Sequence, residues 1–464
     1  MKINKSVFKT EISLLFAQNY VKMANTPSSS SNQLLKLLGV GFGIAVTIGG
    51  TIGTGILRKP GPVAAQLGDP WLIMGIWVAI SLYAFLGVLC AIELGVAIPK
   101  AGAWYVYAKR AFGPYVGFFT GITSWLGTVT SLGFGAFTIS EYLGLLFPEV
   151  NNHLTMWSVS ILIVLTAFHM LGTRIGGKSQ EAVSAIKAIA LFAFVAFCFL
   201  KGEAAWGSAE QVNTVAKSGL FVAILGAMQA IFYTFDGWHT AAYFAEENTD
   251  STRNLPKAMI GGVLTIIVIY LLVNLAILYI LPMEQLVQSK LAAADAVTML
   301  AGEQFGKVVT LFLLVSILGL MNAQVMFAPR VLFSMGRDKL FFKQVFMVNK
   351  VGTPAIALLL TGCLSIVLVI LGKETSGRLS DIATFFFVMS YTMGFASLIR
   401  LRKTEPELER PFKVPLYPFL PWFMLICSTL FLIGTVISDW GNSKLAIIFL
   451  CLTYPLYLLL KRIS

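Results

Sequence analysis

Charged residues are scarce in this sequence. Asp, Glu, Lys and Arg account for 12% of its 464 residues, whereas 57% are hydrophobic, and the mean hydropathy is +0.80. A soluble domain carries about 25% charged residues, so this chain has too few of them to cover a surface exposed to water. The composition excludes a soluble protein and predicts an all-α integral membrane protein, because helices satisfy their backbone groups within each span.

Cysteine and histidine are also rare. The cysteines lie within apolar stretches, and the histidines have no acidic or cysteine partner at metal-ligand spacing. We therefore expect no metal, no cofactor and no disulfide bond to a partner subunit. The residues concerned are Cys90, Cys198, Cys363, Cys427, Cys451, His153, His169 and His239.

An enzyme is hard to assemble from these residues, since no nucleophile stands in a recognisable arrangement with a base. The stretch 172–179 (GTRIGGKS) matches the phosphate-binding pattern GxxxxGK[ST]. That motif needs a strand before it in a soluble α/β domain, and here it occupies a short loop between two apolar segments. We therefore predict neither an enzyme nor a pump driven by ATP.

Long apolar runs predict twelve transmembrane helices. A helix needs about 20 residues to cross the hydrocarbon core, and the runs 156–171 and 355–371 are close to the minimum length. The count of twelve requires both of them to cross. The predicted spans are 38–66, 70–97, 113–142, 156–171, 181–200, 219–243, 257–281, 307–334, 355–371, 381–399, 419–438 and 444–460.

The net charge of +12 reflects membrane topology rather than nucleic acid binding. Lys and Arg gather in the segments that share a side with the N-terminus, such as 100–110, 337–350 and 400–413, as the positive-inside rule expects. Both termini are therefore predicted to be cytoplasmic. Residues 1–34 are polar and are expected to form a disordered tail, and residues 35–464 are expected to form a single domain.

Two helix-breaking clusters stand inside apolar segments, Gly49-Gly50-Thr51-Ile52-Gly53-Thr54-Gly55-Ile56 and Tyr233-Thr234-Phe235-Asp236-Gly237-Trp238. Irregular backbone at membrane depth is tolerated only where it lines a cavity enclosed by protein. The clusters fall in the first and sixth segments, which correspond to each other if the chain consists of two repeats of five helices. This pattern predicts that helices 1 and 6 are discontinuous and form a binding site, as in secondary transporters.

The first break favours an anion. Gly53 and Gly55 give an open backbone whose N–H groups can face a cavity, and a half-helix that begins there presents its positive end to a carboxylate. The alternative for these glycines is close helix packing through small residues.

The second break contains an aspartate at membrane depth, which costs roughly 2.5 to 3.5 kcal/mol on insertion scales. Asp236 is expected either to contact a substrate ammonium group or take part in proton coupling, or to cap a half-helix that starts at Gly237. The aromatic residues Tyr233, Phe235 and Trp238 are candidates for a gate over the substrate, with packing as the alternative.

Lys187 lies in a helix that is otherwise apolar after its start. It either extends to the cytoplasmic surface or stays buried as a proton carrier or as a fixed cation where another transporter holds sodium. Glu93, near the inner end of the second span, is expected to pair with a cytoplasmic basic residue.

Short motifs extend over most of the chain. They are GTGI at 53–56, AIELG at 91–95, PKAG at 99–102, FDGW at 235–238, EEN at 246–248, RNLPKA at 253–258, Asn322, PR at 329–330, MGRD at 335–338 and RPFKVP at 410–415. Each motif is weak alone, but their order and spacing resemble the amino acid, polyamine and organocation transporter superfamily. The likeness is to bacterial members of its L-type amino acid transporter branch.

The resemblance implies a leucine-transporter-type fold, with inverted five-helix repeats at about 38–200 and 219–399 and two further helices at about 419–460. In such proteins the substrate's carboxylate and amino group meet the exposed backbone of helices 1 and 6, and a lysine of helix 5 stands beside the broken first helix. The lysine maps onto Lys187, which makes sodium dependence unexpected. The substrate contacts map onto Thr51, Gly53, Thr54, Gly55, Tyr233, Thr234, Phe235 and Asp236.

Three features depart from the family pattern. Arg58 and Lys59 place two charges where an apolar run is common, either shaping the outer vestibule or lying at its rim. Asp236 stands where animal relatives carry glycine. The outer loop 143–155 has no cysteine, so the disulfide-linked heavy subunit of some animal relatives is not expected.

The implied function is an amino acid permease of the cytoplasmic membrane that works by alternating access. Neutral L-amino acids are the expected substrates, carried by exchange or by proton symport, with the lipid bilayer as the other partner. A carrier of cationic amino acids or polyamines is an alternative within the class, and a non-transporting nutrient sensor is an alternative outside it.

Overall fold

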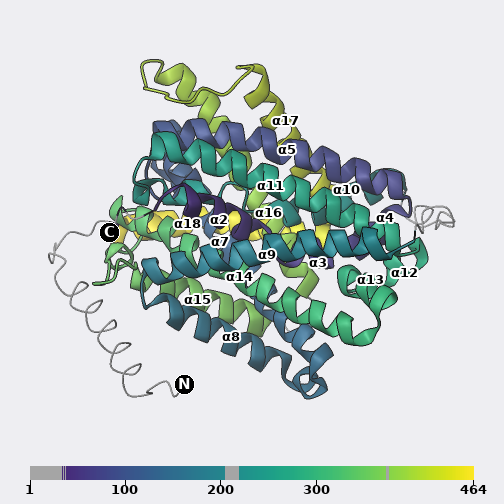
Figure 1. Cartoon of the computed structure of the whole chain (residues 1–464). Helices are drawn as coiled ribbons and strands as arrows, with labels where there is room; N and C mark the ends of the chain where they lie inside the picture. The colour runs from purple at the N-terminus through teal and green to yellow at the C-terminus, as the bar shows by residue number, and fades with distance from the viewer. Residues whose placement is uncertain (1–33, 35, 37, 204–218, 373–375, 464) are drawn as a thin grey trace, which may run out of the picture. The chain divides into compact units, whose positions relative to one another are not determined.

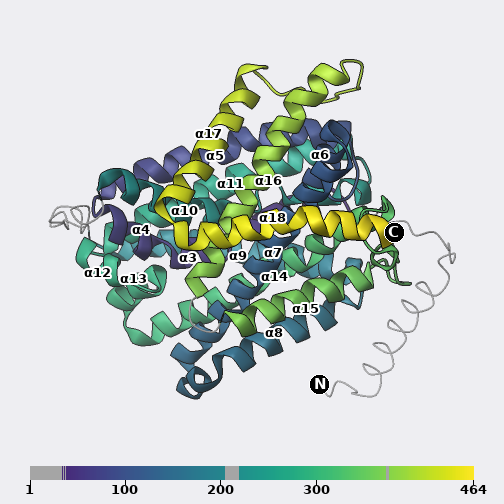
Figure 2. The same cartoon turned by 180° about the vertical axis from the view of Figure 1, so that it is seen from behind.

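The computed structural model describes residues 34, 36, 38–203, 219–372 and 376–463. Across these residues the chain forms helices joined by turns and loops, with one isolated pairing of extended backbone between Leu38 and Asn248. The long helices run side by side in both views (Figures 1 and 2). The predicted disordered tail lies outside the described residues, apart from Leu34.

The helices follow the predicted apolar segments in order. Their bounds are α2 (Val40–Thr51), α3 (Thr54–Arg58), α4 (Pro60–Leu67), α5 (Pro70–Ala97), α6 (Trp104–Phe112), α7 (Pro114–Leu146), η1 (Pro148–His153), α8 (Leu154–His169), α9 (Thr173–Lys201), α10 (Leu220–Phe235), η4 (Thr240–Glu247), α11 (Ser251–Ile280), α12 (Met283–Gln288), α13 (Ala292–Ala301), α14 (Glu303–Arg337), η5 (Lys343–Phe346), α15 (Ala355–Leu371), α16 (Ser376–Thr404), α17 (Phe419–Ser438) and α18 (Trp440–Ile463).

Eleven helical segments in the described residues are long and apolar enough to cross a membrane, which confirms a multi-pass helical membrane protein. Three of these segments combine neighbouring helices: α2 with α3, η1 with α8, and α10 with η4. The predicted ninth span forms α15, a helix of 17 residues, so the count of twelve stays a prediction.

The sequence interpretation missed several short helices and misplaced several helix starts, among them those of α9, α11 and α16. Helices α6, α12 and α13 lie between the predicted spans. Helix α9 begins at Thr173 rather than near 181, so the stretch 172–179 forms the first turns of a helix and not a loop. A helix hydrogen-bonds its backbone N–H groups internally after the first turn, which gives a physical reason to reject the phosphate-binding motif.

Helix α2 lies in the interior of the helix assembly, where it contacts α9, α11 and α14. In their most apolar stretches, Val40–Arg58 is 83% buried, whereas Trp440–Arg462 is 28% buried. Helix α18 therefore presents most of its surface outward, as a helix in contact with lipid does. Helix α7 packs against α14 and α16 on the other side of the interior, and the site described next lies among these helices.

Candidate functional site

Both predicted breaks are present. The backbone leaves the helical path at 52–53, between α2 and α3, and at 236–239, between α10 and η4. The continuation of helix 6 differs from the prediction, because the 3₁₀ helix η4 begins at Thr240 with His239 as its N-cap residue, and no side chain caps it. The prediction of a half-helix that starts at Gly237 and is capped by Asp236 is therefore wrong, since a turn of four residues separates α10 from η4.

The two breaks touch each other. A methyl group on Gly55 would lie 2.5 Å from the Cα atom of Thr234, and one on Gly237 would lie 2.3 Å from the carbonyl oxygen of Gly50. Gly237 also has a φ of 108°, in the region that only glycine adopts at low cost. Close packing through glycine, considered above as an alternative for the first break, therefore occurs, and it occurs between the breaks themselves.

The Lys187 ammonium group lies at the end of α2. The side chain is fully buried, and Nζ donates to the carbonyl oxygens of Gly49 (3.2 Å) and Ile52 (2.7 Å). The last carbonyl groups of a helix have no partner within it and form its negative end. Lys187 donates to two of them from a fully buried position, so the prediction that it extends to the surface is wrong, and its two predicted buried roles, proton carrier and fixed cation, stay predictions.

A tyrosine that the sequence interpretation did not identify connects the two breaks. The Tyr270 hydroxyl oxygen lies 2.8 Å from the carbonyl oxygen of Thr51 and 3.0 Å from that of Thr234. These carbonyl groups belong to the last residue of α2 and to the next-to-last residue of α10. One side chain of α11 therefore contacts the end of each half-helix.

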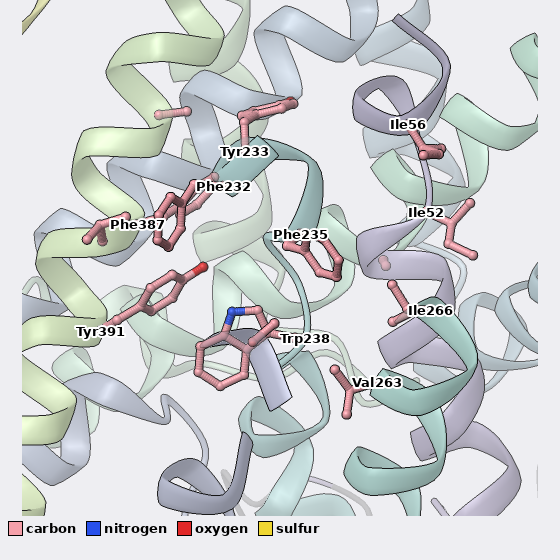
Figure 3. Packing of buried hydrophobic residues seen from close by; sticks show 14 of the residues in the cluster. Ile52, Ile56, Phe232, Tyr233, Phe235, Trp238, Val263, Ile266, Phe387 and Tyr391 are labelled. Atoms are coloured by element: carbon pink, nitrogen blue, oxygen red, sulfur yellow. The ribbon is translucent and has the colours of Figure 1, made fainter. Parts of the chain in front are cut away.

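Asp236 faces helix α16 rather than η4. Its carboxylate accepts a hydrogen bond from the hydroxyl group of Tyr391, and both residues are buried. The ring of Tyr391 also packs against Trp238, with ring centroids 5.1 Å apart. Figure 3 shows Phe235 and Trp238 between Phe387 and Tyr391 on one side and the first-helix residues on the other.

Tyr233 contacts the first break on the side of α3 and Lys59. Its hydroxyl oxygen lies 2.9 Å from Ser131 Oγ and 3.4 Å from Thr54 Oγ1, and Ser131 accepts a further hydrogen bond from Gln324 (2.8 Å). The ring lies beneath the Lys59 ammonium group, 5.5 Å from the ring centroid. Tyr233 thus connects α10 to α7 and to α3, the helix that follows the first break.

A cavity of about 510 Å³ opens on the side of Lys59. Charged and amide side chains in its lining come from the end of α3 and the residue after it, from α10, from the start of α16 and from the turn between α17 and α18: Arg58, Lys59, Gln229, Asp381 and Asp439. Lys59 Nζ donates to Ser380 Oγ (2.9 Å) and lies 3.8 Å from Asp381 Oδ1. Arg58 and Lys59 therefore line this cavity, and their predicted place in an outer vestibule or at its rim stays a prediction.

Ion pairs occupy the opposite side of the breaks, near the start of α2. Arg330 binds both carboxylate oxygens of Glu247, with Nη2 2.7 Å from Oε2, and both residues are almost completely buried. Two further ion pairs join residues near the C-terminal ends of their helices. They are Arg337 with Glu246 (2.7 Å) and Arg402 with Glu93 (2.6 Å). The predicted pairing of Glu93 with a basic residue is confirmed.

Comparison with known sequences assigns the chain to a family. The sequence profile of the amino acid permease family matches residues 43–454, which is most of the chain. The chain belongs to the amino acid permease family. The family resemblance seen in the motifs is thereby confirmed.

Curated relatives of the permease are amino acid transporters. It is 30% identical over 448 residues to the serine/threonine exchanger SteT of Bacillus subtilis, a match that covers 94% of the permease and 99% of the relative. The b(0,+)-type amino acid transporter 1 of Mus musculus is 29% identical, with coverages of 92% and 88%. The large neutral amino acids transporter small subunit 2 of Mus musculus is 28% identical, with coverages of 85% and 76%.

The permease brings its predicted site residues together at the junction of the two breaks. All of them are buried, and Lys187 joins them through Gly49 and Ile52. Two of the candidate gates lie on different sides of the second break, Tyr233 toward the cavity and Trp238 against Trp104 and Tyr391. The predicted set is Thr51, Gly53, Thr54, Gly55, Tyr233, Thr234, Phe235, Asp236, Trp238 and Lys187.

The sequence interpretation did not identify several hydroxyl groups that contact the breaks from other helices. Ser131, Tyr270 and Tyr391 each bind a residue of a break. Tyrosine and serine in an apolar span are as consistent with packing as with function, so the sequence carried no signal that separated these three from the others.

Proposed function

We propose that the permease exchanges small neutral L-amino acids across the cytoplasmic membrane by alternating access. The observation that carries this proposal is the contact between two broken helices, with a buried lysine at the carbonyl end of the first. Exchange is favoured by the similarity to a serine/threonine exchanger over nearly the whole length of both chains. Proton symport is the other coupling that the experiment below tests.

The proposed substrate site lies on the backbone of the two breaks. The α-carboxylate binds at the start of α3, where Gly53 provides no side-chain cap and backbone N–H groups are available to an anion. The amino group binds on the backbone of residues 233–236. Tyr233 closes this site toward the cavity, and Trp238 closes it toward Trp104.

Lys187 acts in coupling as a fixed cation. Its charge at the end of α2 stabilises the broken helix without a bound ion, which is the task that sodium performs in other transporters according to the resemblance. We therefore propose transport that does not depend on sodium.

We also propose a leucine-transporter-type arrangement of the helices. Helices α2–α3, α5, α7, α8 and α9 form the first repeat, and α10–η4, α11, α14, α15 and α16 form the second, with α17 and α18 added. The two interrupted helices then occupy the first position of each repeat, as paired broken helices do in inverted-repeat transporters. This assignment needs α15 to cross the membrane as the ninth of twelve spans.

The proposed orientation follows from the charges. Both termini lie in the cytoplasm, so the ion pairs of Glu246 and Glu247 close the cytoplasmic side, and the cavity at Lys59 opens outward. The five cysteines are free and lie within helices, so we propose a permease that works without a disulfide-linked heavy subunit.

A carrier of polyamines or cationic amino acids has less support. Such a substrate needs an acidic partner for its second ammonium group, and the acidic side chains near the site already have partners: Asp236 accepts a hydrogen bond from Tyr391, and Asp381 lies 3.8 Å from the Lys59 ammonium group. Uptake of labelled lysine or putrescine by the purified permease would favour this alternative.

Uptake into proteoliposomes tests the proposal. The purified permease is reconstituted with or without internal serine, with or without an inward proton gradient, and with sodium or potassium outside. Exchange predicts that internal serine accelerates uptake of labelled serine and threonine, independently of sodium. Acceleration by the proton gradient alone would establish symport, and no uptake of any neutral amino acid would overturn the proposed function.

A further inference from the structure

Tyr270 has a position that its burial alone does not explain. It lies in the middle of α11 with no exposed surface, and its ring meets Trp77 and Phe235 edge-on, with centroids 5.9 Å and 5.0 Å apart. A phenylalanine would make these ring contacts equally well. The feature specific to tyrosine is the hydroxyl group, which reaches carbonyl oxygens of both breaks.

The carbonyl groups at the end of α2 have separate donors. The oxygen of Ile48 accepts from the N–H group of Ile52 (2.8 Å), and the oxygens of Gly49 and Ile52 accept from Lys187. Thr51 lies between them, and its carbonyl oxygen accepts from Tyr270 at 2.8 Å. Lys187 and Tyr270 thus approach the same end of α2 and donate to different carbonyl groups.

The end of α10 shows the same division. The N–H group of Asp236 lies 3.1 Å from the carbonyl oxygen of Phe232 and 3.2 Å from that of Tyr233. The next carbonyl oxygen, that of Thr234, is 3.0 Å from the Tyr270 hydroxyl oxygen. Two helix ends that each carry partial negative charge therefore converge on one hydroxyl group.

A hydroxyl group has a single hydrogen to donate. With two carbonyl oxygens at 2.8 Å and 3.0 Å, that hydrogen is shared between them or alternates from one to the other. In either case the oxygen atom fixes how far apart the two carbonyl groups stand, and so fixes the end of α2 relative to the end of α10. Without the hydroxyl group, two buried acceptors of like partial charge would face each other with no donor between them.

We propose that Tyr270 is a positioning residue of the permease, whose hydroxyl group holds the two breaks in the relative position that binds an amino acid. The proposal rests on the proposed function, because the backbone that it positions is the proposed substrate site. Tyr270 acts through Thr51 and Thr234 and not by touching the substrate.

The test replaces one oxygen atom and compares two variants. Tyr270→Phe keeps the ring contacts with Trp77 and Phe235 and removes the hydroxyl group. Tyr83→Phe is the matched control, because its buried hydroxyl group binds Ser428 Oγ (2.7 Å), and its ring packs against Phe232 (4.8 Å) without reaching a break carbonyl. Both variants lose one buried hydroxyl hydrogen bond.

Four quantities are measured for each protein in detergent and in proteoliposomes. They are the yield of monodisperse protein, the Kd for the labelled neutral amino acid that the wild type exchanges best, and the KM and maximal rate of exchange. For Tyr270→Phe we expect a normal yield, a Kd and an external KM raised about tenfold, and a smaller change in maximal rate. For Tyr83→Phe we expect wild-type Kd and KM.

The outcomes separate the two proposals. Equal Kd and KM for the two variants, beside a wild type that binds amino acids, would overturn the role of Tyr270 and leave the proposed function intact. A yield for Tyr270→Phe far below that of Tyr83→Phe would make the hydroxyl group a folding element and would also overturn the positioning role. A wild type that binds no amino acid would overturn the proposed function and this inference with it.

Discussion

The ammonium nitrogen of Lys187 lies 2.7 Å from the carbonyl oxygen of Ile52, the residue that follows the last residue of α2. This contact joins the fifth long helical segment to the break in the first. A cation at this end of a helix is favoured by the helix dipole, and the carbonyl groups exposed by the break supply acceptors that an intact helix would not offer. The broken helix and the buried lysine are thus two parts of one structural unit.

Replacing Lys187 should therefore abolish most transport without preventing insertion. Lys187→Met keeps the apolar part of the side chain but leaves the carbonyl groups of Gly49 and Ile52 without their donor, and a hydrogen bond to a charged group contributes about 1.5 to 3 kcal/mol. We expect amino acid exchange to fall by about tenfold or more, measured as initial uptake into proteoliposomes.

The control for this variant is Lys201→Met, at the exposed end of the same helix. It should insert and exchange amino acids like the wild type. Wild-type rates in Lys187→Met, at equal protein per vesicle, would remove Lys187 from the coupling mechanism.

Lys59 is expected to control closure of the cavity rather than substrate affinity. Its ammonium group joins the region after α3 to Ser380 of α16 and covers the ring of Tyr233. Lys59→Met removes that link, so the state closed at the cavity loses about 1 kcal/mol, which corresponds to roughly a fivefold change in an equilibrium. We expect a maximal exchange rate about fivefold lower, with an external KM that does not rise.

Exchange kinetics measured with external substrate check this expectation, with Lys307→Met as the control variant. Lys307 forms an ion pair with Glu303 that is largely exposed, and such pairs contribute little to stability. If Lys59→Met instead raised the KM at an unchanged maximal rate, Lys59 would be a substrate contact and not part of the closure.

Sequence patterns located the breaks because few roles exist for glycine clusters and charged groups at membrane depth. Gly55, Gly237 and Lys187 were identified on that basis, and all three lie at the junction. The continuation of helix 6 was predicted incorrectly. The positive φ of Gly237 directs the chain into a turn, and no residue pattern indicated that a 3₁₀ helix would follow.

The same reasoning could not predict the contacts made by uncharged hydroxyl groups. Tyr270 reaches Thr51 across 219 residues of sequence, and Tyr391 reaches Asp236 across 155. A tyrosine has an apolar ring that any membrane helix can bury, so its function depends on which backbone group lies opposite its hydroxyl oxygen. That information exists only once the helices are packed.

The buried pair between Arg330 and Glu247 should dominate stability on its side of the protein. Glu247→Gln leaves the guanidinium group without its counter-charge, and breaking a buried pair in this way costs roughly 3 to 5 kcal/mol. We expect a clear drop in the midpoint of thermal unfolding in detergent. Glu303→Gln, which breaks the exposed pair with Lys307, should cost less than about 0.5 kcal/mol. Equal midpoints for the two variants would contradict a structural role for the buried pair.

Tyr233 is expected to lower the KM for exchange by closing the proposed substrate site. Its hydroxyl group holds Ser131 and Thr54 across the first break, so Tyr233→Phe frees one side of the closed site while its ring still packs against Phe134 (5.3 Å). Loss of such hydrogen bonds costs about 1 kcal/mol, and we expect the KM for exchange to rise about fivefold. Tyr115→Phe, whose ring packs against Tyr454 and Tyr457 away from the breaks, should keep the wild-type KM. Because the two variants lose the same atom, a KM that rises equally in both would assign the effect to general loosening of the helices and not to closure by Tyr233.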